Sequence, residues 1–195
     1  MKVSGRKIWL TASLASVGIA LILTYALAAV TSYGTFRGDV IRCPMGGLKG
    51  STFNGISSIG QTTVNPSFRV NEVSNVGDPQ QYANLTPVAL EGTTNDPRFG
   101  TITWRLDDTR TAPETTVRGL SQGKEYPAEV NIYAYATAQA QNITFRSTVP
   151  VHLVGRNVTH FKPFNSDASF TLTESVVFES TEGLTFTLNS INFGG

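Results

Sequence analysis

The sequence contains one cysteine and few charged residues, and each shortage narrows what the chain can be. A single thiol, Cys43, cannot form an internal disulfide, so the fold must be stable without one. We expect this thiol to be buried as a small apolar group, as free cysteines commonly are. Charged side chains make up 15% of the chain while 40% of its residues are hydrophobic. Such a composition excludes an intrinsically disordered protein, which has many charges and few apolar residues.

The sequence also lacks the motifs of common catalytic and phosphate-binding sites, including the nucleophile elbow and the phosphate loop. His152 and His160 have no cysteine or carboxylate at a ligand spacing, which predicts ordinary packed or surface histidines and no metal site. Neighbouring strand residues point to opposite faces, so the acidic pair Asp107-Asp108 predicts a turn at a strand end rather than converging carboxylates. We therefore predict a protein that is not an enzyme, with no catalytic residue and no cofactor.

The most distinctive feature of the sequence is its N-terminal segment, which is basic at first and then uncharged. Three basic residues fall within the first seven positions, and residues 8–30 then carry no charge. The run contains an A-x-A-like site, which predicts a signal peptide, residues 1–28, cut between Ala28 and Ala29. Because the run is also long enough to span a bilayer, a retained membrane anchor is the alternative. In both cases the positive N-terminus predicts export of the remaining chain to the cell surface or beyond.

Beyond this segment the charges nearly balance. Residues 29–195 carry 12 basic and 14 acidic side chains, a net charge of −2. No basic block and no stripe of alternating basic and aromatic residues appears there. We predict no nucleic-acid partner, and contact with a membrane only through the N-terminal segment.

The body of the chain has the apolar pattern of β-strands. Ile102, Trp104 and Leu106 alternate with polar residues, as in a half-buried strand. Four further stretches have apolar patterns typical of strands: 130–136, 149–153, 170–178 and 184–188. Glu182-Gly183 predicts a hairpin turn, and no helical periodicity follows residue 31. The prediction is an all-β fold, an antiparallel β-sandwich of the immunoglobulin, pilin or jelly-roll kind, with its main domain over residues 44–195.

Residues 34–41, Gly-Thr-Phe-Arg-Gly-Asp-Val-Ile, are followed closely by Cys43. This stretch resembles the start of chaperone–usher pilins, in which an N-terminal extension completes the sheet of the next subunit. The wider plan, a leader followed by one Thr-rich sandwich with few charges, resembles TasA- and camelysin-like fibres and archaeal thread or bundling pili.

The resemblance implies a structural subunit of an extracellular filament or surface layer, serving adhesion or biofilm formation by β-strand addition between copies of the chain. Residues 29–43 are the candidate donor strand, with apolar plugs at Tyr33, Phe36, Val40 and Ile41. The alternative is that they form the protein's own first strand; residues 190–193 are a less favoured donor. Further expected partners are cell-surface glycans or other surface proteins. A membrane-anchored extracellular binding module is the alternative function.

Three Asn-x-Thr sequons occur in the body of the chain, beginning at Asn84, Asn142 and Asn157. Each is a candidate N-glycosylation site on an exported protein.

Overall fold

The computed structural model consists of two compact units, residues 1–30 and 31–195. The residues that it describes all belong to the second unit: 31–43, 45, 52–53, 56–57, 62–96, 99–160 and 168–193. The predicted leader and its cleavage site at Ala28 and Ala29 lie outside the described residues. Within the described ranges, none of the helical structure is long and apolar enough to cross a membrane.

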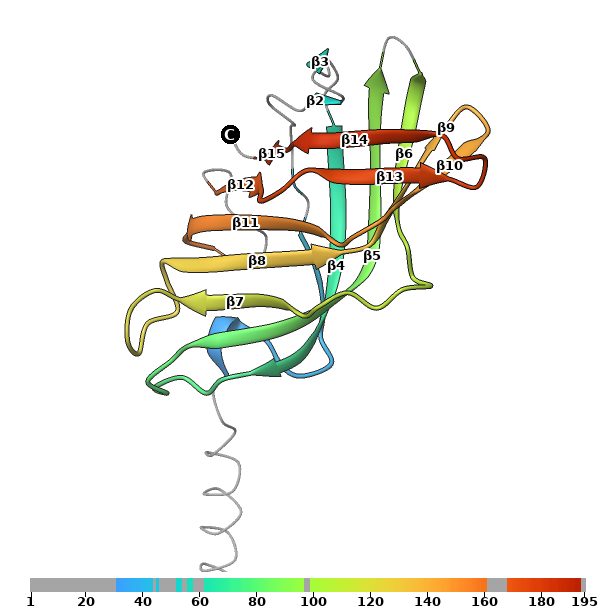
Figure 1. The fold of residues 1–195 in the computed structure, drawn as a ribbon. Helices are drawn as coiled ribbons and strands as arrows, with labels where there is room; N and C mark the ends of the chain where they lie inside the picture. Colours follow the sequence, from blue (N-terminus) through green and yellow to red (C-terminus); the bar gives the residue numbers. More distant parts are fainter. Residues whose placement is uncertain are drawn as a thin grey trace, which may run out of the picture. The chain divides into compact units, whose positions relative to one another are not determined.

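The described residues form β-strands with antiparallel pairing throughout, which confirms the predicted all-β, antiparallel class (Figure 1). A short 3-10 turn, η1 (Ser32–Gly34), precedes them. The strands are β1 (Val40–Arg42), β2 (Thr52–Phe53), β3 (Ile56–Ser57), β4 (Thr62–Val73), β5 (Tyr82–Asp96), β6 (Gly100–Leu106), β7 (Thr115–Gly119), β8 (Ala128–Ala134), β9 (Ala136–Ala140), β10 (Ile143–Ser147), β11 (Val151–Val158), β12 (Ser169–Leu172), β13 (Val176–Ser180), β14 (Thr185–Ser190) and β15 (Asn192–Phe193).

These strands belong to one continuous 15-stranded sheet that branches at the long strand β5. One edge of β5 pairs with β4 along most of its length. The other edge pairs with β7 through residues 82–85 and with β6 through residues 91–96. We name the two branches the first half-sheet (β7, β8, β11, β12, β15) and the second half-sheet (β6, β9, β10, β13, β14, β2, β3).

The chain passes back and forth between the half-sheets along a line that we name the seam. The seam comprises residues 86–90 of β5 and the connections between strands of different half-sheets: 107–114, Tyr135, 148–150, 173–175 and Ile191. Four of these connections are only one to three residues long, whereas 107–114 has eight residues. The seam therefore joins the half-sheets tightly everywhere except at residues 107–114.

Alternating burial explains why these sequences form strands. In β6, Ile102 and Trp104 are buried while Thr101 and Arg105 are exposed, as the apolar pattern predicts. The predicted turns at Asp107-Asp108 and at Glu182-Gly183 are also present. The single strand predicted over 170–178 is wrong, because the chain crosses the seam at 173–175 and forms β12 and β13 in different half-sheets.

The core contains an aromatic cluster on the second half-sheet. Phe178 is fully buried and its ring lies edge-on to Trp104, with 5.6 Å between ring centroids. Phe178 also stacks on Phe186 at 4.8 Å, and Phe186 meets Phe145 at 5.1 Å. Edge-to-face and offset aromatic pairs stabilise a core beyond the area that they bury.

Candidate ligand-binding cavity

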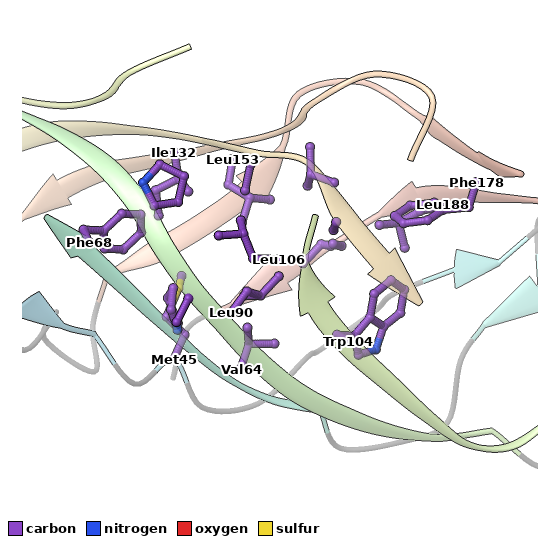
Figure 2. A pocket seen from close by; sticks show the side chains of 17 residues that line it. Met45, Val64, Phe68, Leu90, Trp104, Leu106, Ile132, Leu153, Phe178 and Leu188 are labelled. Carbon is purple, nitrogen blue, oxygen red and sulfur yellow. The ribbon is translucent and has the colours of Figure 1, made fainter. Parts of the chain in front are cut away.

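A cavity lies inside the described domain, between the half-sheets and at the seam (Figure 2). The space open to the centre of a water-sized sphere is about 80 Å³. Its 17 lining side chains are all hydrophobic: Met45, Val64, Pro66, Phe68, Pro87, Ala89, Leu90, Trp104, Leu106, Ile132, Ala134, Ala136, Val151, Leu153, Phe178, Leu188 and Ile191. An apolar hollow is the most common setting for a small-molecule site in proteins, so this cavity is the candidate site of the described domain.

The path of β5 explains why the cavity lies at the seam. Up to Ala89 the odd-numbered residues of β5 face the core, and from Leu90 onward the even-numbered residues do. The strand therefore rotates at this point, and both Ala89 and Leu90 line the cavity. Among the described strands, residues 86–90 pair on one edge only, with β4, because β7 has ended and β6 has not begun. The cavity opens where the sheet divides.

Small side chains keep this space from being filled. Ala134 and Ala136 flank the break between β8 and β9, and Ala89 lies on the rotated part of β5. A leucine at any of these positions adds three carbon atoms to a wall of the cavity. Larger apolar side chains, including Leu90 and Leu153, line the space between its two ends (Figure 2).

Different apolar side chains lie at the two ends of the cavity. At one end lie Phe68 and Met45, and at the other lie Trp104 and Phe178 (Figure 2). The Trp104 indole Nε1 donates a hydrogen bond to Thr94 Oγ1 at 2.8 Å. The single polar group among the lining side chains therefore has its partner in the protein. The lining therefore presents apolar contacts, and its indole N–H is already hydrogen-bonded within the protein.

A buried carboxylate lies beside the seam, at the start of the 107–114 connection. Asp107 Oδ1 accepts hydrogen bonds from Thr109 Oγ1 at 2.6 Å and from Arg146 Nη1 at 2.8 Å. Burial alone would raise the pKa of Asp107, but the hydrogen bonds from Thr109 and Arg146 and the charge of Arg146 together outweigh it. The pKa of Asp107 is therefore below its ordinary value. Asp108 is exposed, so the two carboxyl groups do not converge.

Replacing Asp107 with Asn is expected to lower the free energy of unfolding at pH 7 by about 1–2 kcal/mol, since Arg146 is half exposed and its ion pair is screened. A depressed carboxyl pKa stabilises the fold above the ordinary pKa of about 4, and this contribution is lost as the pH falls through the folded-state pKa. The difference between the original chain and Asp107→Asn in urea unfolding should therefore shrink between pH 5 and pH 2. The matched control is Asp108→Asn; an equal loss from it would contradict this role for Asp107.

Part of the candidate donor strand, β1, pairs within the protein's own sheet, whereas Tyr33 lies in η1 and Phe36 in the loop that follows. β1 pairs with β4 of the same chain, with Ile41 opposite Phe68. Tyr33 and Ile41 are buried, whereas Phe36 and Val40 are more than half exposed. The arrangement corresponds to the second alternative, in which this segment is the domain's own first strand.

The remaining candidate residues are dispersed. Cys43 is buried, as expected, and burial raises its thiol pKa to about 12. His152 stacks on Tyr133 and is hydrogen-bonded through Nε2 to Asn131 and through Nδ1 to Thr173. Burial lowers the pKa of His152. His160 is exposed and stacks on Tyr126.

The three sequon asparagines have different surroundings. Asn84 is half-buried on β5; its amide donates to Glu72 and its carbonyl accepts from Arg118. Asn142 is exposed in the turn between β9 and β10, and Asn157 is exposed on β11. Asn142 and Asn157 thus offer more accessible amides than Asn84.

Sequence reasoning missed the cavity itself. Its lining residues read as ordinary strand and core positions, and they come from strands that are far apart in the chain. The signal that was present is the pair of alanines at 134 and 136, small side chains on either side of the break between β8 and β9 that both line the cavity.

No protein-family model matches the sequence, and no curated protein matches it significantly. Among solved structures, the chain is similar to DynF from the dynemicin biosynthesis pathway of Micromonospora chersina. The similarity has a TM-score of 0.60 at 14% sequence identity and covers 87% of this chain and 86% of DynF. At this identity the comparison establishes a shared fold.

This comparison corrects the predicted function. The prediction of an extracellular filament subunit assembled by strand addition is wrong, because nearly the whole chain shares its fold with a biosynthetic-pathway protein. The misleading signal was the short stretch 34–43, whose residues belong to η1, β1 and the loop between them, with Cys43 directly after β1.

Proposed function

We propose that this protein binds a small, uncharged, apolar molecule inside the cavity at the seam. The observation that carries the proposal is the chemistry of the lining: 17 hydrophobic side chains, with the indole N–H already hydrogen-bonded. A charged or strongly polar ligand would lose its hydration there without gaining a partner. One water molecule needs roughly 10–15 Å³ of such volume, and the cavity has about 80 Å³. The cavity therefore suits a ligand of about one or two fused rings.

In this proposal the two half-sheets act as the two layers of a sandwich-like container. The first half-sheet contributes Ile132 and Leu153 to the cavity, and the second contributes Trp104 and Phe178. Acid–base or nucleophilic groups are absent from the described lining, which favours binding over catalysis. The sequence alone further supports the proposal that the N-terminal segment exports the chain.

The direct test uses 1-fluoronaphthalene as an uncharged probe of suitable size, observed by ¹⁹F NMR. Binding is expected to broaden and shift its resonance in proportion to protein concentration. The charged counterpart 4-fluoro-1-naphthoate should bind much more weakly, because its carboxylate would be desolvated without a partner. Comparable binding of both compounds would contradict an apolar internal site.

A cavity-filling variant locates the site. Ala136→Leu is expected to abolish 1-fluoronaphthalene binding, because the new side chain occupies the wall from which Ala136 lines the cavity. The control is Thr137→Leu, which introduces the same side chain one position along β9, where the residue is half-buried and does not line the cavity. Circular dichroism checks that both variants fold. Unchanged binding to folded Ala136→Leu would exclude this cavity as the site.

A further inference from the structure

We infer that the connection between β6 and β7, residues 107–114, is a strap that controls access to the cavity; the inference rests on the proposed function. The strand pairing on either side of the strap shows where the strap runs. Arg105 of β6 pairs with Glu91, and Thr115 of β7 pairs with Leu85. The chain between Leu106 and Thr115 must therefore travel back along β5 from residue 91 to residue 85.

The stretch that the strap follows is the part of β5 that lines the cavity. Six residue steps of a strand span roughly 20 Å, which eight residues of connecting chain cover with slack. Pro87, Ala89 and Leu90 lie on this stretch, and on the strap side they have no neighbouring strand among those described. Leu106, directly before the strap, also lines the cavity. The strap thus runs along the cavity wall at the place where the sheet itself is interrupted.

Arg110 fastens the strap across the seam. Its guanidinium donates to the carbonyl oxygens of Ser147 at 2.5 Å and Thr148 at 3.0 Å. It also lies over the ring of Tyr135, 3.6 Å from the centroid. Tyr135 is the break between β8 and β9, and its neighbours on both sides, Ala134 and Ala136, line the cavity. One side chain therefore covers the seam directly outside two lining residues.

The remaining fastenings are a few hydrogen bonds and one ion pair near the two ends of the strap. Asp107 N donates to Tyr135 O at 2.8 Å, and the carboxylate of Asp107 binds Arg146. Asp107 Oδ2 is buried and has no hydrogen-bond partner in the described part of the chain, so this end is incompletely satisfied and less costly to release. At the far end Glu114 accepts a hydrogen bond from Asn71 at 2.8 Å, where both groups are exposed.

No other described crossing of the seam has this freedom. The crossings at Tyr135, 148–150, 173–175 and Ile191 are too short to move away from the sheet without breaking strand pairs. The strap has no regular strand pairing of its own between residues 107 and 114. Among the described crossings of the seam, the strap is therefore the one that can move with the loss of the fewest backbone hydrogen bonds.

The test uses the full chain with Trp9→Phe, which leaves Trp104 as the only tryptophan. Arg110→Ala is expected to increase acrylamide quenching of Trp104 fluorescence several-fold. It should also raise the association and dissociation rates of 1-fluoronaphthalene by a similar factor, measured by ¹⁹F exchange NMR, with an unchanged Kd. Arg105→Ala is the control, because Arg105 is an exposed arginine on β6, outside the strap. Arg110→Gln is the second variant if Arg110→Ala does not fold.

The outcomes separate the two proposals. If 1-fluoronaphthalene binds but neither Arg110 variant differs from Arg105→Ala in exchange rate or quenching, the strap is overturned and the binding function stands. If quenching rises in the Arg110 variants while no 1-fluoronaphthalene binds, access control by the strap is supported and the proposed ligand class is overturned. A change in the dissociation rate alone, with a matching change in Kd, would also contradict the strap, since it would assign Arg110 a role in the bound state.

Discussion

Phe178→Ala is expected to lower the free energy of unfolding by about 3–5 kcal/mol, the usual cost of removing a fully buried aromatic side chain. Phe178 is completely buried and touches both Trp104 and Phe186. It also lines the cavity, so its removal enlarges an existing space that the surrounding β-sheet cannot close by small shifts. Urea unfolding followed by circular dichroism measures the loss.

The control for this variant is its neighbour on β13. Val177 points outward with 38% of its surface exposed, so Val177→Ala should change the free energy of unfolding by about 0.5 kcal/mol or less. Similar losses from the two variants would mean that β13 does not present alternate faces to the core and to solvent.

Gly119→Ala is expected to cost about 3 kcal/mol or more, although alanine is ordinarily tolerated in a strand. A Cβ atom at Gly119 would lie 2.0 Å from the carbonyl oxygen of Lys124, far inside van der Waals contact. The obstacle is backbone, which a rotamer change cannot remove. The turn that contains Lys124 is held in place, because Gly123 N donates to Pro79 O at 2.8 Å.

Thermal and urea unfolding of Gly119→Ala should show the loss, with Ser121→Ala as the control in the same turn. Ser121 is exposed, so its replacement should leave stability within about 0.5 kcal/mol of the original. A Gly119→Ala chain as stable as this control would show that the turn moves aside at little cost.

Local pattern predicted the strands well, because burial alternates with the pleat. The β6 prediction succeeded since its apolar residues fall on every second position and its partners cover one face. β12 and β13 were merged because Phe170, Val176 and Phe178 are buried and Leu172 packs against the same core on either side of the bend. The bend depends on which distant strands each segment pairs with, and local sequence does not encode that choice.

The cavity was beyond sequence reasoning for a related physical reason. Val64, Trp104 and Leu153 are each ordinary strand residues, and only the branching of the sheet brings them around one space. Asp107 shows that one residue can have both a predictable and an unpredictable feature. The turn was predictable from adjacent polar residues, but the burial of its carboxylate against Arg146 depends on a strand 39 residues away.

The repeated exchange of the chain between half-sheets has a consequence for how the protein reaches its native state. Neither half-sheet is a continuous piece of sequence, so neither can fold completely before the other begins to form. Ile102 must pair with Ala140, and Leu153 must pair with Leu172. Each pairing closes a loop of intervening chain, and the entropy cost of that closure comes before the pairing stabilises the fold. Chains dominated by such non-local pairings acquire their structure slowly, on the order of milliseconds to seconds. The half-built sheet leaves strand edges unpaired during that interval, and self-association then competes with completion of the fold.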